Sequence, residues 1–261
     1  MVQKANQSMD QRQQPLTMPD THARKIITNF GRFAKQYGEQ STLQQAVAQE
    51  LLSALPKGTT PKRILEIGCG TGNLTHLLSA RFPSAHITAT DVTPEMLHEV
   101  QRKISNTSHI ETMHLNGEDI TPLQGQTFDL IISNMTVQWL DDIQGCYDAW
   151  QSILAPSGTI LTSRPAENCF PEWRNSLAHC GYQSGLHPFQ STRGKISHIT
   201  IPQEYGSTLN FLRSMRTTGA ATPHPDYTPL THSQIKHAYT YCDAAHNGRI
   251  TWHIQIDMIK N

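Results

Sequence analysis

Short apolar runs and helically spaced apolar residues alternate along the first part of the chain. The runs, which predict buried strands, are residues 63–67, 86–90, 128–133 and 159–162. Apolar residues three or four positions apart, which predict helices, occupy residues 43–55, 74–78, 94–100 and 143–154. Strands that alternate with helices in this way predict an α/β fold whose parallel sheet is covered on both faces.

The pattern weakens after residue 163, where Pro, Gly and His are scattered. Residues 209–215 and 234–241 have helical spacing, and we expect them to belong to smaller elements that cap the sheet. Apolar and polar residues alternate from Arg249 to Ile259, which predicts a final strand. We expect this strand to supply an edge of the sheet.

The composition suits one domain, because 261 residues, 37% of them hydrophobic, can bury a sizeable core. Residues 1–20 are polar and Gln-rich, so we expect a disordered tail rather than a secretory signal. No apolar run approaches the roughly 20 residues that cross a bilayer, so we expect no membrane segment and a cytoplasmic protein. The expected single domain, 21–261, comprises an N-terminal lead-in and lid (21–58), a cofactor-binding core (63–163), and an acceptor cap with edge strands (164–261).

Charge and cysteine usage exclude several functional classes. The 21 Lys+Arg balance the 21 Asp+Glu, and without a dense basic stripe no nucleic-acid partner is expected. The five cysteines include no CxxC pair, which argues against a disulfide framework and against a zinc site. The 14 histidines form no HExxH motif and no cluster with ligand spacing, so no metal site is predicted.

A glycine-rich turn, Gly68-Cys-Gly-Thr-Gly72, follows the first predicted strand and precedes a helix. Such a turn lets backbone approach a ligand closely, and the helix N-terminus offers free N–H groups at the carboxyl ends of the strands. A dinucleotide fingerprint would need Gly or Ala at position 73, where the chain has Asn73. Asp91 ends the second strand and is either a ligand-binding carboxylate or only the cap of the helix that begins near Pro94.

Glu66 with Gly68, Gly70 and Gly72 resembles the E/DxGxGxG motif of class I S-adenosylmethionine-dependent methyltransferases. The resemblance implies a doubly wound, mostly parallel seven-stranded sheet of the Rossmann-like type, with an N-terminal lid and C-terminal cap helices. It also implies S-adenosylmethionine as cofactor, with Glu66 at the methionine ammonium group and Asp91 at the ribose hydroxyls. A carboxylate suits the ribose because it can accept hydrogen bonds from two adjacent hydroxyls.

The same resemblance assigns further residues to the cofactor site. Glu118 and Asp119 fall where the family places an acidic loop against the adenine amino group, and Asn134 would line the sulfonium pocket. The remaining predicted cofactor contacts are Gly68, Cys69, Gly70, Gly72, Val92 and Met96. Within this set Cys69 is expected to be a small spacer rather than a nucleophile. Trp139, outside the set, is expected to lie in the core rather than to contact a ligand.

A narrower resemblance extends beyond the cofactor half, from about residue 26 to the C-terminus. Residues 29–38, Ser133-Asn-Met-Thr-Val-Gln-Trp-Leu140 and residues 212–216 are similar to the malonyl-acyl-carrier-protein O-methyltransferase family of biotin synthesis. The chain departs from that family at residues 216–220 and 249–253, both in the region expected to meet the acceptor.

This narrower resemblance implies that the free carboxylate of a malonyl thioester on acyl carrier protein is converted to its methyl ester, an early step of biotin synthesis. A carboxylate with a pKa of about 4 is already ionised at neutral pH, so no catalytic base is assigned. Tyr37, Arg213 and Arg249 are the candidate acceptor contacts, and Phe30 and Arg32 would join Tyr37 in a lid. We expect a monomer whose partner is the acyl carrier protein.

Three alternatives compete with this interpretation. One is a methyltransferase for another small-molecule acceptor, which would need a base near the methyl group if the target were a hydroxyl. Another is a cofactor-binding regulatory or assembly protein, which turnover with any acceptor would exclude. The third is a nicotinamide dehydrogenase, against which Asn73 counts.

Overall fold

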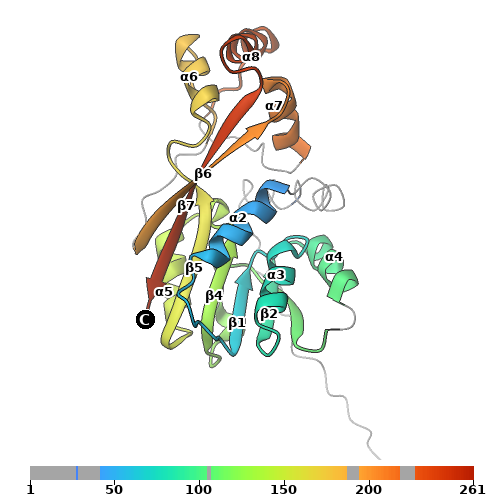
Figure 1. Cartoon of the computed structure of the whole chain (residues 1–261), viewed down its shortest axis with the longest axis vertical. Coiled ribbons are helices and arrows are strands. Elements are labelled where there is room, and N and C mark those ends of the chain that lie inside the picture. Colours follow the sequence, from blue (N-terminus) through green and yellow to red (C-terminus); the bar gives the residue numbers. More distant parts are fainter. Residues whose placement is uncertain (1–27, 29–41, 105–106, 187–193, 218–226) are drawn as a thin grey trace, which may run out of the picture.

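A single seven-stranded sheet organises the protein in the computed structural model, which describes residues 28, 42–104, 107–186, 194–217 and 227–261 (Figure 1). The strands are β1 (Arg63–Ile67), β2 (His86–Asp91), β3 (Ile110–His114), β4 (Phe128–Asn134), β5 (Leu154–Pro165), β6 (Lys195–Glu204) and β7 (Arg249–Lys260). Their order across the sheet is β3-β2-β1-β4-β5-β7-β6, and β7 runs in the direction opposite to the other six strands. The predicted doubly wound, mostly parallel fold is confirmed.

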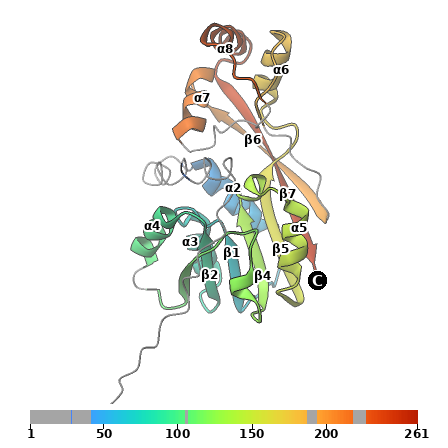
Figure 2. The ribbon, with the colours of Figure 1, turned by 180° about the vertical axis from the view of Figure 1, so that it is seen from behind.

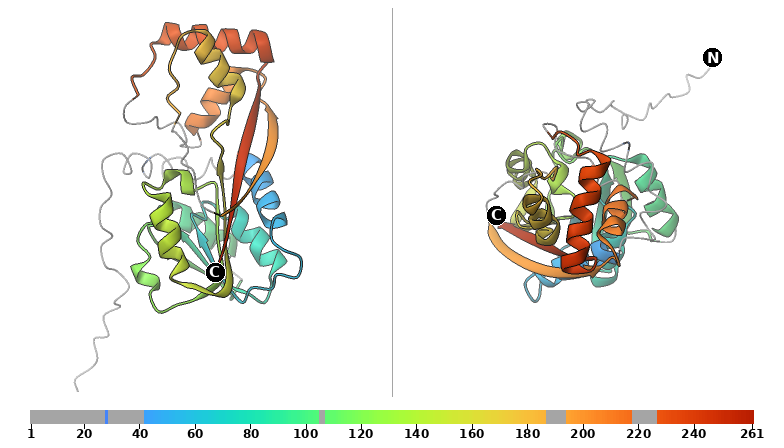
Figure 3. Two further views of the ribbon diagram at one scale, coloured as in Figure 1. Left: turned by 90° about the vertical axis from the view of Figure 1, so that its left-hand side faces the viewer. Right: turned by 90° about the horizontal axis from the view of Figure 1, so that it is seen from above.

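Helices cover both faces of the sheet, as Figures 2 and 3 show. The helices are α2 (Thr42–Ser53), α3 (Asn73–Arg81), α4 (Pro94–Ile104), α5 (Ile143–Gln151), α6 (Pro171–His179), α7 (Thr208–Thr217) and α8 (His232–His246). Two short 3₁₀ turns are η1 (Thr121–Leu123) and η2 (Val137–Trp139). Apolar residues of α2 and α3 pack on one face of β1 and β4, and those of α5 pack on the other face. The parallel strands therefore have apolar side chains on both faces, as their continuous apolar runs predict.

The long strands β6 and β7 carry a cap above the parallel part of the sheet, formed with α6, α7 and α8 (Figure 1). The cap has its own apolar core, in which the ring of Phe170 packs edge-on against Trp252 with centroids 4.4 Å apart. The helices predicted near 209–215 and 234–241 are confirmed as parts of α7 and α8. The lead-in helix is confirmed as α2, whereas the tail and the residues of the predicted lid, Phe30, Arg32 and Tyr37, lie outside the described residues.

The prediction that the final strand forms an edge is wrong. β7 lies between β5 and β6, and β6 is the edge. The alternation in β7 reflects one face buried by Ile250, Trp252, Ile254 and Ile256. β6 escaped prediction because Ser, His, Thr and Gln interrupt its three isoleucines, of which Ile196 is 43% exposed. A polar edge strand has no periodic apolar signature to recognise.

Two further boundaries differ from the sequence pattern. The helix predicted over 143–154 ends at Gln151, and Leu154 already opens β5, which continues to Pro165. β3 was not predicted, because it lies at the other edge of the sheet and its five residues are only partly buried or exposed. Its sequence therefore lacks the apolar run of a central strand.

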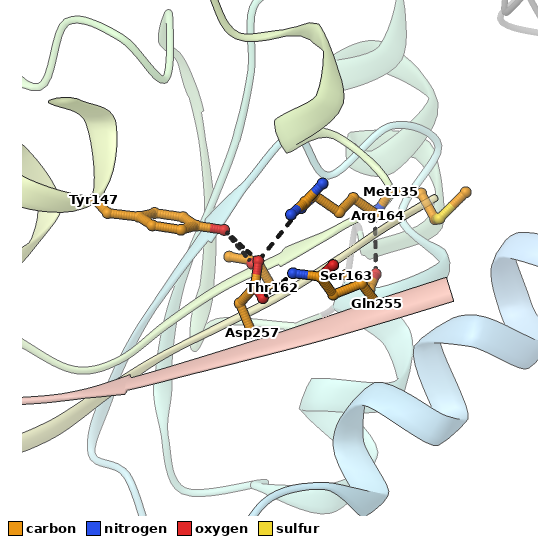
Figure 4. Close-up of polar contacts among 7 residues, drawn as sticks. All are labelled: Met135, Tyr147, Thr162, Ser163, Arg164, Gln255 and Asp257. Carbon is orange, nitrogen blue, oxygen red and sulfur yellow. Dashed lines mark hydrogen bonds and ion pairs between the residues drawn. The ribbon is translucent and has the colours of Figure 1, made fainter. Parts of the chain in front are cut away.

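A cluster of polar side chains is buried where β5, β7 and α5 meet (Figure 4). Arg164 Nε lies 3.4 Å from Asp257 Oδ2, and both side chains are 1% exposed. The Tyr147 hydroxyl lies 2.6 Å from Thr162 Oγ1 and donates to Asp257 Oδ2 at 3.2 Å. Gln255 Nε2 donates to the other Asp257 oxygen at 2.7 Å. The Asp257 carboxylate is thus satisfied by protein groups from three elements, as a buried charge requires.

Among the residues that the structure describes, no helix is both long and apolar enough to span a membrane. The five cysteines are free thiols, and the described part of the chain contains no group of three His, Cys, Asp or Glu side chains that could hold a metal ion.

Candidate active site

The glycine turn after β1 brings backbone to the carboxyl edge of the sheet. Gly68, Gly70 and Gly72 have φ angles of 72°, 53° and 88°, a region that glycine adopts without steric cost. A Cβ atom at Gly68 would collide with the side chain of Thr136, whose Oγ1 lies 3.2 Å from the Gly68 carbonyl. Glycine is therefore required at position 68 because the segment after β4 packs directly on the turn.

Asp91 links the end of β2 to this turn. Its Oδ2 accepts the Gly70 N–H at 2.9 Å, and its Oδ1 accepts the Thr93 N–H at 2.8 Å. Burial raises the pKa of Asp91, although both backbone hydrogen bonds oppose that shift. The two interpretations of Asp91 are thus compatible, since it caps the segment before α4 and also lines a pocket.

Glu66, the penultimate residue of β1, is 1% exposed and faces the same pocket. Its Oε2 accepts a hydrogen bond from Thr75 Oγ1 of α3 at 2.7 Å. Burial raises the pKa of Glu66 to about 8, and the nearby Asp91 carboxylate adds to the increase. Neither carboxylate has a Lys or Arg ion-pair partner within the described ranges. A cationic ligand would stabilise the ionised form of a carboxyl group that is buried in this way.

The pocket lies along the carboxyl ends of β1, β2 and β4, where ligands bind in open α/β sheets. Nine predicted cofactor residues line it: Glu66, Gly68, Cys69, Gly70, Asp91, Val92, Met96, Glu118 and Asn134. Gly72 does not, since it is the cap of α3. Asp119 does not line it either, because its Oδ1 accepts the Thr121 N–H of η1 at 3.1 Å.

The loop after β3 closes one side of the pocket and is fixed from the opposite face of the sheet. Trp150 Nε1 of α5 donates to the Gly117 carbonyl at 2.8 Å. Glu118 Oε1 accepts the Asp141 N–H at 2.7 Å, which joins this loop to the segment before α5. Glu118 therefore lies in the pocket with one of its oxygens already engaged.

The Asn134 carboxamide, at the end of β4, has a defined orientation. Its Nδ2 donates to the Gln44 carbonyl of α2 at 3.0 Å, and its Oδ1 accepts from Ser163 Oγ of β5 at 2.8 Å. The next residue, Met135, has a φ of 54°, which turns the chain sharply into the segment leading to η2. These contacts join α2, β4 and β5 at the mouth of the pocket.

The sequence interpretation missed several pocket residues, among them Gln44, Leu115, Asn116, Met135, Thr136 and Leu140. Gln44 belongs to a helix whose sequence pattern shows only its apolar face, so its approach to the pocket depends on tertiary packing. The expectation that Trp139 lies in the core is wrong, because it is half-buried and lines the pocket. Its position in Asn134-x-x-x-Gln138-Trp139, directly after a strand end, was the available signal.

The predicted acceptor contacts are not part of this pocket. Arg213 is exposed on α7, with its nearest described partner Asn210 at 3.5 Å. Arg249 is exposed at the start of β7, and its Nε lies 3.8 Å from Glu204 Oε1. Neither lines the pocket, and Tyr37 lies outside the described residues.

Comparison with known proteins agrees with this geometry. Residues 64–158 match the family described as a methyltransferase domain. The malonyl-[acyl-carrier protein] O-methyltransferase of Magnetococcus marinus is 29% identical over 245 residues, covering 88% of this chain and 90% of that protein. A second relative, malonyl-[acyl-carrier protein] O-methyltransferase 2 of Ilyobacter polytropus, is 35% identical over 59% of each chain.

A biotin biosynthesis bifunctional protein of Bordetella avium is 29% identical over 84% of this chain, which spans 48% of that protein. Two solved structures share the fold. A putative methyltransferase from Bacillus halodurans has a TM-score of 0.54 at 10% identity, covering 82% of this chain and 98% of that one. YcgJ from Bacillus subtilis has a TM-score of 0.53 at 15% identity, with coverage of 82% and 96%. The chain therefore carries an S-adenosylmethionine-dependent methyltransferase domain over residues 64–158, with the fold that these two solved structures share.

Proposed function

We propose that this protein transfers the methyl group of S-adenosylmethionine to the free carboxylate of a malonyl thioester carried by acyl carrier protein. The product is the methyl ester, and the reaction is an early step of biotin synthesis. The observation that carries this proposal is the extent of the likeness to the Magnetococcus marinus enzyme, which covers 88% of this chain. The likeness therefore includes the cap above the sheet as well as the cofactor half.

The residues of the pocket fit the proposed cofactor. Glu66 and Asp91 are buried carboxylates without a cationic side chain, which suits a ligand that carries an ammonium group and a sulfonium. Asp91 uses one acceptor position on each oxygen, so each oxygen retains a lone pair for a ribose hydroxyl. We assign Glu66 to the ammonium group, Asp91 to the ribose and the loop of Glu118 to the adenine amino group.

When bound, S-adenosylmethionine supplies an electrophilic methyl group, and the protein has to orient the acceptor toward it. Met135, Trp139 and Leu140 form an apolar wall that excludes water and strengthens electrostatic attraction within the pocket. Alignment of the acceptor oxygen with the methyl group supplies the effective molarity. An acceptor carboxylate is already ionised, so the protein need not remove a proton.

The side chains that line the pocket favour a carboxylate acceptor over a hydroxyl. Among the pocket-lining residues that the structure describes, none is His, Lys or Tyr. The carboxyl groups present, Glu66, Asp91 and Glu118, are engaged by Thr75, by two backbone N–H groups and by Asp141 respectively. A hydroxyl acceptor would need a base near the methyl group, which this set does not offer.

Methyl transfer from labelled S-adenosylmethionine to malonyl-acyl carrier protein tests the proposal. Acetyl-, succinyl- and unloaded carrier protein and malonyl-coenzyme A serve as comparison acceptors. We expect transfer to the malonyl carrier and none to the acetyl carrier, which has no free carboxylate. Transfer to the acetyl carrier, or intact cofactor binding without transfer to any of these acceptors, would contradict the proposal.

A further inference from the structure

The end of β4 carries a hydrogen-bond donor that the cofactor assignments leave unused. We propose that the Asn134 carboxamide binds the acceptor carboxylate through Nδ2–H, and that Ser163 is the positioning residue that orients this amide. The inference rests on the proposed function and names the contact that would recognise its substrate. Malonate, as the end of a thioester, is the class of acceptor that this donor would select.

The orientation of the amide follows from the groups on either side of it. The Gln44 carbonyl can only accept, so the Asn134 atom 3.0 Å from it has to be the nitrogen. Ser163 Oγ accepts a hydrogen bond from the Met135 N–H at 3.1 Å. The hydroxyl hydrogen of Ser163 is therefore free to bond to Asn134 Oδ1 at 2.8 Å. The Gln44 carbonyl therefore fixes the orientation of the amide, and the Ser163 hydroxyl, which can both donate and accept, matches it.

One N–H of Asn134 remains available after these bonds are made. The Nδ2 group carries two hydrogens, and among the described residues only the Gln44 carbonyl accepts one of them. Asn134 is half-buried and lines the pocket, so its second hydrogen has access to a bound molecule. The bond from Ser163 to Oδ1 prevents the amide from rotating to present its oxygen instead.

The charges around the pocket make such a donor necessary for an anionic acceptor. Glu66, Asp91 and Glu118 all line the pocket, and an unscreened carboxylate would be repelled by them when they are ionised. The nearby hydroxyl of Thr136 is directed at the Gly68 and Asn134 carbonyls, each at 3.2 Å. Gln138 Nε2 donates to the Met135 carbonyl at 2.8 Å. Gln138 does not line the pocket, so on its β4 side Asn134 is the residue that presents a side-chain amide donor.

A bond from a neutral N–H to the acceptor carboxylate holds the oxygen in place without protonating it. Arginine would neutralise the attacking oxygen more strongly, whereas an amide orients it and leaves its lone pairs available for attack. The buried Arg164 does not line the pocket and is 1% exposed. The structure therefore pairs its buried guanidinium with Asp257 and offers an amide to the substrate.

Four variants of the full-length protein test the proposal. Asn134→Ala removes the donor, and Asn134→Asp replaces it with an anion of the same shape. Ser163→Ala frees the amide, whereas Ser163→Thr keeps the hydroxyl. Thr162→Val is the matched control, because it removes a buried hydroxyl from the adjacent residue of β5 on the opposite face of the sheet, where Thr162 contacts Tyr147.

We expect Asn134→Ala to lower kcat/KM for malonyl-acyl carrier protein by roughly 10- to 150-fold, the loss expected for a hydrogen bond to a charged group. Asn134→Asp should lose more, because it repels the acceptor. Ser163→Ala should raise KM for the carrier by about 3- to 10-fold, as expected for one neutral hydrogen bond, with Ser163→Thr close to wild type. Thr162→Val should affect stability only, and binding of S-adenosylhomocysteine should stay within about threefold throughout.

Equal losses of S-adenosylhomocysteine affinity and of kcat/KM in Asn134→Ala would overturn the inference, since Asn134 would then be a cofactor contact. Activity of Ser163→Ala equal to that of wild type would show that Ser163 does not orient the amide. Should the wild-type protein methylate only a neutral acceptor, the proposed function and this inference would both be wrong.

If the wild-type protein transfers no methyl group to the malonyl carrier, the proposed function fails separately. The binding of malonyl-acyl carrier protein to the protein loaded with S-adenosylhomocysteine then decides the inference, measured by fluorescence anisotropy with acetyl-acyl carrier protein as comparison. Weaker binding of the malonyl carrier by Asn134→Ala, with binding of the acetyl carrier unchanged, supports the contact. No binding preference for the malonyl carrier in wild type, or equal binding by wild type and Asn134→Ala, overturns it.

Discussion

The sheet buries carboxylates in two places, one at the junction of β5, β7 and α5 and two in the pocket, and they differ in which groups satisfy them. At the β5–β7–α5 junction, Asp257 meets Arg164, Tyr147 and Gln255, all from the protein (Figure 4). In the pocket, Glu66 is 1% exposed, and among the described residues Thr75 is its hydrogen-bond donor, whereas Asp91, 8% exposed, receives two backbone N–H groups.

The difference separates a carboxylate that is buried to stabilise the fold from carboxylates that are buried to bind a ligand. A buried charge needs an opposite charge or several donors, and at the junction the fold itself supplies the guanidinium. In the pocket the fold leaves that charge to a ligand, so burial raises the pKa of both Glu66 and Asp91. Removing a charge at the junction should therefore change stability, whereas removing one in the pocket should change binding.

The largest effect is expected at the junction. Asp257→Leu leaves Arg164 buried without its carboxylate, which should lower the free energy of unfolding by about 3–5 kcal/mol. Urea denaturation followed by circular dichroism measures this change. The affinity of the folded fraction for S-adenosylhomocysteine should stay near that of wild type.

The double variant Arg164→Met with Asp257→Leu provides the control. It removes both charges, so it should be more stable than Asp257→Leu alone, because an apolar pair of similar size needs no ion partner. A double variant less stable than either single variant would show that the cluster stabilises the fold through packing rather than through charge pairing.

The next largest effect is expected at Asp91. Asp91→Ala should weaken S-adenosylhomocysteine binding by about 1.5–3 kcal/mol, or roughly 10- to 150-fold, since hydrogen bonds from the ribose to a charged group are lost. The loss of stability should be much smaller than that of Asp257→Leu. Isothermal titration calorimetry gives the affinity, and thermal unfolding gives the stability.

Asp129→Ala is the matched control for Asp91→Ala. Asp129 Oδ2 also accepts two backbone N–H groups, from Lys62 at 2.8 Å and Arg63 at 2.9 Å, but at the opposite end of β1. Asp129→Ala should lower local stability by a similar amount without weakening the binding of S-adenosylhomocysteine. Equal affinity losses in the two variants would mean that Asp91 acts by holding the sheet together.

This contrast also explains how much the sequence could predict. Glu66, the glycines and Asp91 follow apolar strands directly, so a local pattern identifies them together with the strand ends that position them. Arg164 and Asp257 are 93 positions apart, and they meet only because β5 and β7 pair with Arg164 opposite Gln255. No local sequence pattern specifies that register. For the same reason the sequence did not reveal that β6 pairs with β7, and β7 was wrongly predicted to be an edge strand.

An intermediate effect is expected in the pH dependence of cofactor binding. With a pKa of about 8, Glu66 is mostly protonated at neutral pH in the free protein, whereas a bound ammonium group favours the carboxylate. The affinity for S-adenosylhomocysteine should therefore rise with pH by up to about tenfold per unit and level off near pH 8. Calorimetry in buffers of different ionisation enthalpy should detect the proton released on binding.

The stability of the free protein should change in the opposite direction. The folded pKa of Glu66 lies above its ordinary value of 4.5, so the folded state binds more protons than the unfolded state between these two values. Glu66 thus contributes a loss of stability as pH rises from about 4.5 to 8, at most about 1.4 kcal/mol per unit. Glu66→Gln should flatten both profiles, and unchanged profiles would mean that Glu66 does not titrate in this range.

The smallest effect is expected at the exposed charges of the cap. Arg249 is 58% exposed and only 3.8 Å from the exposed Glu204, so it contributes little to stability. If the acidic carrier protein docks near the cap, Arg249→Glu should raise KM for malonyl-acyl carrier protein by less than about tenfold, mostly at low salt. Lys260→Glu makes the same charge change at the other end of β7 and should leave KM unchanged. A docking site on the cap should respond to the charge reversal at Arg249 but not to the one at Lys260. An equal increase in KM in both variants would therefore reflect net charge alone.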